Sequence, residues 1–416
     1  MQSVDLKTVL AGVEIRGCVQ PYLEGFAAEL ILAGYAVLPI RDYVRSAAHL
    51  GRWMDSRKIG IDRIGQEILA RFATHECDCP FSHRHGRCPS GRYVKRARQF
   101  VDYLGRVGAA PMLPSPLATV VPEPLVEFHD WMTQHRGVKP STIKRYQRLV
   151  EKMLPALGGD PAVYDAALVR QVVVRVAKRM SPGNAKTYVS AIRAFLRFLA
   201  ITGRCRPHLD RAVPTVPEWK LSALPRYLES GDIESLIASC DLSKSYGIRD
   251  RAILLLLVRL GLRAGDITAM RLADLDWDAG MVRVRGKGRR EVCLPLPQDA
   301  GDALIKYLTD ARPNAVTDHV FLCSNAPVRP FASSASVSDV VRLALQRAGI
   351  VDAPSKGAHL LRHSAATTML RSGASLDVIA TVLRHQSSDT TAYYAKVDIK
   401  LLALVAQPWP EGHHAN

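Results

Sequence analysis

The chain has 416 residues, of which 48% are hydrophobic and 23% charged, and a chain of this length usually forms two or three domains. This composition supports buried cores and excludes a mainly disordered or collagen-like protein. Lys and Arg number 56 against 39 Asp and Glu, so the net charge is +17. That excess favours a polyanionic partner, with nucleic acid ahead of an anionic membrane surface.

Membrane insertion and secretion find little support in the sequence. The longest apolar run near the middle, Ala252–Val258, is far shorter than the ~20 residues of a spanning helix. The first ten residues lack the charged and apolar regions of a signal peptide. Eight cysteines are too few and too scattered for a disulfide scaffold. We therefore expect a cytoplasmic protein with reduced thiols and no membrane partner.

Two proline-containing segments divide the chain. Residues 111–116 carry three prolines, which prevent a helix there, and a second such stretch runs from Pro207 to Pro225. The predicted parts are an accessory N-terminal block at 1–110, a helical block at 117–208, a mixed block at 226–404 and a short tail at 405–416.

The N-terminal block contains three Cys and two His between residues 77 and 88. These are the donor types that zinc prefers, although the spacing fits no standard finger, and a reduced cysteine-rich loop is the alternative. From 84 to 106 the chain then has seven Lys or Arg and one acid. That stretch is either a solvated helix or, as we favour, an additional nucleic-acid contact. The predicted zinc ligands are Cys77, Cys79, His83, His85 and Cys88.

The helical block shows apolar residues at helical spacing. A helix is predicted from Pro140, with Ser141 or Thr142 as its cap. Later an apolar stripe runs from Val189 to Leu199. Basic residues occupy another face of the same helix, which is either solvated or laid against phosphates. These residues are Lys186, Arg193 and Arg197.

The mixed block combines helices with one hairpin. A long apolar helix is predicted over 250–262. Alternating residues predict strands at 281–285 and 291–294, joined by a turn at 286–288. Helical patterns follow at 302–308 and 337–348, and again over 358–405 with short breaks. The predicted fold class is therefore mainly α with a small antiparallel β-sheet (α+β).

The same block gathers cations around one phenol. Two arginines and two histidines can surround a phosphodiester, because the planar guanidinium meets two phosphate oxygens at once. His and Arg three residues apart point the same way on a helix, and a lysine at a hairpin tip can reach a departing oxygen. Fixed cations stabilise the negative charge of a pentacoordinate transition state. The residues are Arg263, Lys287, His359, Arg362, His385 and Tyr394.

In this order and spacing, residues 226–404 resemble the catalytic domain of the tyrosine recombinases, the phage integrase family. Residues 117–208 are similar, less specifically, to its helical core-binding domain. The resemblance implies a C-shaped clamp around duplex DNA, and Tyr394 as the nucleophile of a 3′-phosphotyrosyl bond. It also implies that Lys287 protonates the 5′-oxygen, that Asp266 supports Arg263, and that two strand exchanges pass through a Holliday junction in a tetramer, or in a hetero-assembly of related recombinases.

Two positions leave alternatives open. Arg384 stands where the family usually has Gly, and we favour a solvated side chain over an added cation at the site. Tyr393 precedes Tyr394, but the nine-residue offset from His385 selects Tyr394.

The prediction is a site-specific DNA recombinase or integrase of a mobile element that needs no cofactor for catalysis. A topoisomerase IB-like enzyme and a silent DNA-binding protein are the alternatives. The predicted DNA contacts are Lys144, Arg145, Lys186, Arg193, Arg197, Arg289 and Arg290.

Overall fold

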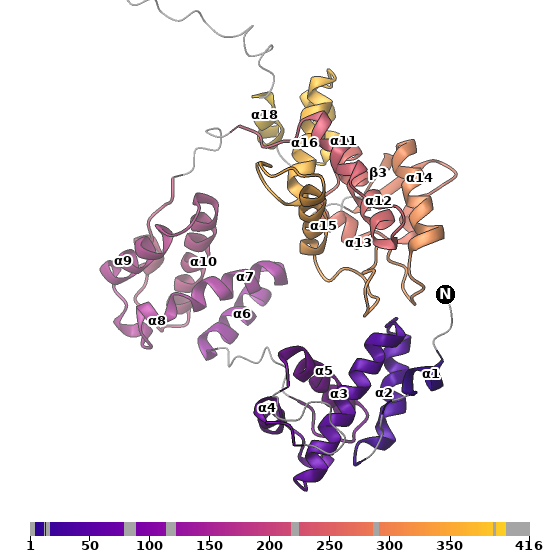
Figure 1. Cartoon of the computed structure of the whole chain (residues 1–416). Helices are drawn as coiled ribbons and strands as arrows, with labels where there is room; N and C mark the ends of the chain where they lie inside the picture. The colour runs from indigo at the N-terminus through magenta and orange to yellow at the C-terminus, as the bar shows by residue number, and fades with distance from the viewer. Residues whose placement is uncertain are drawn as a thin grey trace, which may run out of the picture. The chain divides into compact units, whose positions relative to one another are not determined.

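The structure, a computed structural model, describes residues 5–11, 13, 17–78, 89–113, 122–217, 224–285, 291–385 and 388–396. Its chain divides into two compact units, one made of residues 114–222 and the other of residues 1–113 together with 223–416 (Figure 1). In the described ranges, no helix combines the length and apolar character needed to span a membrane.

The N-terminal block is helical and has a core of its own. Rings of Phe26, Trp53, Phe72 and Phe100 are buried at its centre. Phe26 and Phe100 meet edge to face, with ring centroids 5.1 Å apart. The elements are α1 (Leu6–Leu10), α2 (Gln20–Leu32), α3 (Val37–Ser56), a short turn η1 (Ile61–Arg63), α4 (Gln66–Thr74) and α5 (Gly91–Arg106).

Residues 122–217 form a second helical unit around Phe128, Ile143 and Phe195. A helix does begin at Pro140, but Lys139 holds its N-cap position and makes no side-chain hydrogen bond. The predicted cap was therefore wrong, because Ser141 and Thr142 lie inside the helix. The elements are α6 (Glu123–Arg136), α7 (Pro140–Glu151), α8 (Leu154–Leu157), η2 (Pro161–Val163), α9 (Ala166–Ala177), α10 (Pro182–Ile201) and η3 (Leu209–Ala212).

The mixed block surrounds a small sheet with helices, so the predicted fold class is confirmed. The sheet has the antiparallel order β1-β2-β3. Val282 and Val284 face the core opposite Leu294 and Val292. The elements are α11 (Ser230–Ala238), α12 (Ser245–Arg259), α13 (Ala264–Ala269), η4 (Leu272–Asp274), β1 (Leu275–Asp276), β2 (Met281–Arg285), β3 (Glu291–Pro295), α14 (Gln298–Lys306), η5 (Tyr307–Ala311), α15 (Ser334–Arg347), α16 (Ala358–Arg371), α17 (Leu376–Leu383) and α18 (Ser388–Ala395).

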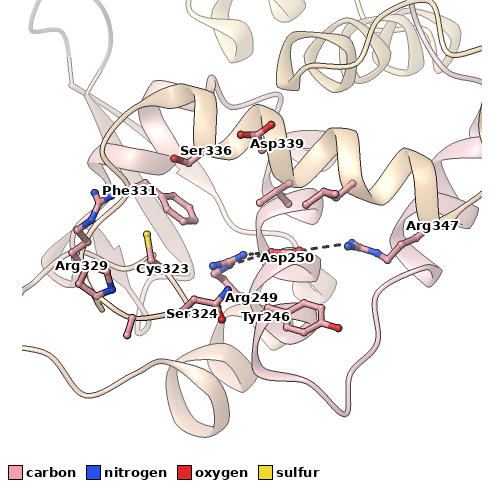
Figure 2. Close-up of a pocket in the computed structure, with 15 residues that line it drawn as sticks. Tyr246, Arg249, Asp250, Cys323, Ser324, Arg329, Phe331, Ser336, Asp339 and Arg347 are labelled. Atoms are coloured by element: carbon pink, nitrogen blue, oxygen red, sulfur yellow. Dashed lines mark hydrogen bonds and ion pairs between the residues drawn. The ribbon is translucent and has the colours of Figure 1, made fainter. Parts of the chain in front are cut away.

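A buried carboxylate anchors α12 to α15. Figure 2 shows Arg249 and Arg347 reaching Asp250 from two sides. Nη2 of Arg249 lies 2.7 Å from Oδ1, and Nη2 of Arg347 lies 3.7 Å from Oδ2. Burial raises the pKa of Asp250, while both arginines oppose that rise. Arg249 also donates to the carbonyl of Leu322 at 3.1 Å. This network fixes the start of α12, the helix that leads into the candidate site.

Candidate active site

The site begins where α12 gives way to α13. Gly261 lies between them with a φ of +59°, and a Cβ there would come within 2.4 Å of Leu383 Cδ2. Glycine suits this position for two reasons: the backbone is left-handed, and α17 approaches too closely for a side chain. Arg263 follows as the N-cap residue of α13. Its Nη2 donates to the carbonyls of Leu383 and Arg384, at 3.3 and 3.1 Å. The turn thus fastens the first predicted arginine to the end of α17.

Helix α16 supplies the second arginine. Arg362 is 2% exposed, and its guanidinium donates to the carbonyls of Gly261 and Leu383. His359 lies one turn earlier on the same helix, as the three-residue spacing predicts. Burial lowers the pKa of Arg362 to about 10, and repulsion from Arg263 and Arg384 contributes. The arrangement therefore confines several cations in a space where an anion is electrostatically favoured.

The structure corrects the interpretation of Arg384. Its side chain is only 7% exposed and forms an ion pair with Asp266, so the prediction of a solvated side chain was wrong. The reason is local backbone geometry: Arg384 ends α17 in the left-handed conformation, with a φ of +54°, which turns its side chain inward. Asp266 also accepts the backbone N–H of Arg263 at 2.8 Å. Among the described residues, Nε and Nη1 of Arg384 have no hydrogen-bond partner.

Helix α18 brings the phenol into this cluster. Tyr394 is 2% exposed, and its Oη lies 2.7 Å from Nδ1 of His363. His385 lies parallel to the Tyr394 ring, with centroids 6.2 Å apart. Nδ1 of His385 lies 2.8 Å from the Thr391 hydroxyl, which holds the imidazole in place. Residues from α16 and from the segment that follows α17 therefore converge on one tyrosine of α18.

His363 is a site residue that sequence reasoning missed. It directly follows Arg362, and its ring centroid lies 4.6 Å from that of His359. The available signal was the four-residue spacing between the two histidines, which places them on one face of α16. Only the packing of α18 shows that His363 contacts the phenol.

The phenol and the two imidazoles beside it are neutral near pH 7. Burial, followed by nearby His359 and Arg362, lowers the pKa of His363 to about 4. Burial and the charge of Arg362 lower the pKa of His385 to about 4. The pKa of Tyr394 rises to about 12 because burial outweighs the attraction of Arg362. A neutral imidazole with its proton on Nε2 accepts the phenol hydrogen at Nδ1.

Tyr393 has a different environment from Tyr394. Its hydroxyl donates to the backbone carbonyl of Leu224 at 2.7 Å. The ammonium of Lys396 lies 5.9 Å from its ring centroid. The choice of Tyr394 from its spacing to His385 therefore agrees with the phenol contacts.

Several predicted residues lie outside the described ranges. Lys287, Arg289 and Arg290 fall between residues 286 and 290, and the tail lies beyond residue 396. The role of the hairpin lysine therefore stays a prediction.

The predicted DNA-contact residues of the second unit lie on α7 and α10. Lys144, Arg145 and Lys186 are exposed. Arg193 donates to the carbonyl of Val213 at 2.9 Å, and Arg197 donates to Asp210 at 2.7 Å. The last two side chains therefore hold the unit together. Arg145 is exposed but also donates to Oδ1 of Asn184 at 3.2 Å, which joins α7 to α10.

The predicted zinc stretch is described only at its start. Cys77 is 2% exposed and lies beside two buried histidines, His49 and His75. Neither histidine was predicted. His49 lies on α3, far from the cysteine-rich stretch in sequence, whereas His75 lies two residues before Cys77 and just outside the stretch that was considered. The other predicted ligands, Cys79, His83, His85 and Cys88, lie outside the described residues.

Known proteins are similar to most of the chain. The phage integrase family matches residues 226–400. A putative integrase/recombinase, y4rA of Sinorhizobium fredii, is 35% identical over 399 residues, which cover 95% of each chain. Tyrosine recombinase XerC of Lactobacillus delbrueckii subsp. bulgaricus is 29% identical over 67% of this chain and 95% of its own.

The fold agrees with these sequence matches. A crystal structure of a lambda integrase(75–356) dimer bound to a COC′ core site has a TM-score of 0.53 at 17% identity. The match covers 70% of this chain and 98% of that one. The sequence identity extends over most of the chain, and the family match falls on the mixed block that holds the tyrosine–arginine–histidine cluster. The chain therefore belongs to the phage integrase family and is a tyrosine-type site-specific DNA recombinase.

Proposed function

We propose that the chain cuts and rejoins double-stranded DNA through a covalent 3′-phosphotyrosyl bond to Tyr394, during integration, excision or transposition of a mobile element. The observation that carries the proposal is the 2.7 Å contact between Tyr394 Oη and His363 Nδ1, inside a buried arginine cluster. A relative named a putative integrase/recombinase, which aligns with 95% of this chain, supports the biological role.

The phenol proton must leave during cleavage, and under the proposal His363 accepts it. Tyr394 Oη attacks phosphorus, a new P–O bond to tyrosine forms, and the bond to the 5′-oxygen breaks. The phenol proton passes to Nδ1 of His363, which lies within hydrogen-bond reach. By the family resemblance, Lys287 protonates the departing 5′-oxygen. Because the new phosphodiester keeps the energy of the old one, the 5′-hydroxyl of a second strand can attack it and no ATP is consumed.

The cations supply electrostatic stabilisation. Arg263 and Arg362 are held by backbone carbonyls, so they need little reorganisation when charge develops on the phosphoryl oxygens. Arg384 adds positive charge beside them, since its repulsion lowers the pKa of both. A bound phosphate relieves that repulsion. Catalysis under this proposal uses these side chains and requires no divalent ion or nucleotide.

Strand exchange requires more than one active site. Under the proposal, four subunits, either identical or of related recombinases, assemble on DNA in the cytoplasm and pass through a Holliday junction. By the family resemblance, both the second unit and the mixed block contact the duplex. Exposed Lys144, Arg145 and Lys186, on α7 and α10, bind phosphates. Replacing Lys144 or Lys186 by Ala should reduce the slope of log K against log salt by about 0.9 for each phosphate that is no longer neutralised.

The decisive experiment traps the covalent intermediate. A nicked suicide duplex carrying the ends of the surrounding element is incubated with the full chain in EDTA, and a denaturation-resistant adduct is sought. Wild type and Tyr393→Phe should form it, whereas Tyr394→Phe should not. Tyr393 is the matched control, because it has the same chemistry one residue away but bonds to a backbone carbonyl.

Each other outcome contradicts a stated part of the proposal. An adduct that persists in Tyr394→Phe moves the nucleophile elsewhere. An adduct that forms only after Mg²⁺ is added contradicts the metal-free mechanism. Plasmid relaxation without strand exchange indicates a topoisomerase-like enzyme. Tight DNA binding without an adduct from wild type indicates a silent binding protein.

A further inference from the structure

A cluster of metal-ligating side chains lies in the N-terminal block, in a different core from the recombinase site. One ligand atom from each of His49, His75 and Cys77 can be chosen so that all lie within 4.8 Å of one another. The three side chains are 1%, 8% and 2% exposed. They come from the middle of α3, the C-cap position of α4 and the segment that follows it. The fold therefore gathers three donor groups from two separate helical elements.

The distances suit coordination of one ion. Cys77 Sγ lies 3.3 Å from His49 Nε2. In a tetrahedral zinc site with the usual Zn–S and Zn–N bonds, these two ligand atoms are about 3.5 Å apart. A hydrogen bond between a neutral thiol and imidazole also has such a distance, so this contact alone does not identify a metal.

The orientation of His75 favours a metal. Its Nδ1 lies 2.6 Å from the carbonyl oxygen of Phe72. A carbonyl oxygen only accepts, so Nδ1 carries a proton, and in the neutral ring Nε2 is then the nitrogen with the lone pair that a metal ligand needs. A ring N–H donated to a backbone carbonyl is the usual outer-shell arrangement of a metal-bound histidine. The local backbone thus fixes the tautomer required for coordination.

Aromatic side chains surround the cluster and hold the rings. Phe72 stacks on His75, with ring centroids 5.0 Å apart, and meets His49 edge to face at 5.4 Å. Trp53 lies 5.5 Å from His75, and Tyr93 lies 5.5 Å from His49. An apolar shell of this kind makes polar side chains costly unless they are partnered. A shared cation partners all three together.

We infer that His49, His75 and Cys77 are three ligands of a structural zinc site that joins α3 to the end of α4. Two imidazoles and a thiolate form the borderline-soft donor set that zinc takes in reduced proteins. A fourth ligand completes the tetrahedron. The site stabilises a stretch that otherwise lacks helix or strand, residues 75–78. This inference is independent of the proposed strand-transfer chemistry.

The first test measures metal content of the full chain, purified from zinc-supplemented medium without added chelator. Wild type should hold about one zinc ion per chain. Cys77→Ser, His49→Gln and His75→Gln should each lose most of it. Cys205→Ser is the matched control: it removes another buried thiol, whose Sγ donates to backbone carbonyls in the second unit, and should keep the ion.

A second measurement reads the site spectroscopically and begins with the wild-type chain. Zinc is removed from wild type with a chelator and Co²⁺ is added. A tetrahedral site containing Cys77 should give intense d–d bands and a thiolate-to-cobalt charge-transfer band, and Cys77→Ser should lose the charge-transfer band. Wild type with neither zinc nor a cobalt band overturns the inference and leaves the thiol–imidazole hydrogen bond. Full metal content and an unchanged band in Cys77→Ser also overturn it.

Discussion

The ion pair between Asp266 and Arg384 should stabilise the catalytic cluster through charge. Both side chains are nearly buried, at 6% and 7% exposure. Asp266→Asn keeps the volume of the side chain but removes the charge that faces the arginines. Arg384 is then left buried beside Arg263 and Arg362, whose pKa values its charge already lowers. Arg384→Met instead removes a cation from the same cluster and keeps an unbranched chain.

The two single substitutions should therefore have unequal costs. Removing one partner of a buried pair usually costs about 3–5 kcal/mol, because an uncompensated charge remains. We expect a cost in this range for Asp266→Asn. Arg384→Met should cost about 1–2 kcal/mol, the ordinary range for a single substitution, since Asp266 keeps the N–H of Arg263 at 2.8 Å. The double variant should be more stable than Asp266→Asn alone.

Native-state hydrogen exchange measures the effect locally, which matters because a chain with several cores does not unfold in one step. Peptides covering α13 and α17 report opening of the cluster. Asp266→Asn should accelerate their exchange about a hundredfold or more, at 1.4 kcal/mol for each tenfold change. Peptides from α9 in the second unit serve as the internal control and should exchange at the wild-type rate.

Two results would refute this reasoning. One is less than about a tenfold acceleration in Asp266→Asn, which corresponds to under 1.4 kcal/mol. The other is strict additivity, with the double variant as unstable as the sum of the single variants. Either result would mean that the ion pair contributes no net coupling and that packing alone holds α13 against α17.

Three other properties of the site can be tested by substitution. The lowered pKa values of His363 and His385, both about 4, mean that the unfolded chain binds protons that the folded chain does not. The stability of the site should be full above pH 6.5 and fall towards pH 4, by less than about 1.4 kcal/mol per pH unit for each half-buried histidine. A double Gln variant should flatten this slope, as measured by hydrogen exchange of peptides from α16 and α18 after correction for the intrinsic pH dependence of exchange. His363→Gln alone should slow single-turnover cleavage about a hundredfold or more without weakening DNA binding; an unchanged cleavage rate would remove its role as base. Gly261→Ala places a Cβ 2.4 Å from Leu383 at positive φ, so it should cost about 2–4 kcal/mol, measured by hydrogen exchange of peptides from α13 and α17. Gly265→Ala, with open space around it, should cost much less, and equal effects would contradict the steric argument.

Much of the mixed block, residues 226–404, could be predicted from residue spacing. The three-residue interval between His359 and Arg362 fixes them on one helix face in any helix, because the period is a property of the backbone. The strand at 281–285 was predicted with its observed bounds, since alternation over five residues is a strong signal. β1 was missed because two residues cannot show a period. The apolar helix was predicted to run to residue 262 but ends at Arg259, because Gly261 turns the backbone and the apolar pattern continues past it.

What the sequence alone determined is therefore the set of chemical groups and their order: the arginines, the histidines, the tyrosine and the basic surface that suits a phosphodiester. Tertiary structure decided which of these groups meet. It directed His363 to Tyr394, buried Arg384 against Asp266, and brought His49 beside Cys77. The physical reason is that helical periodicity is local, whereas burial and contact depend on how helices distant in sequence pack against one another.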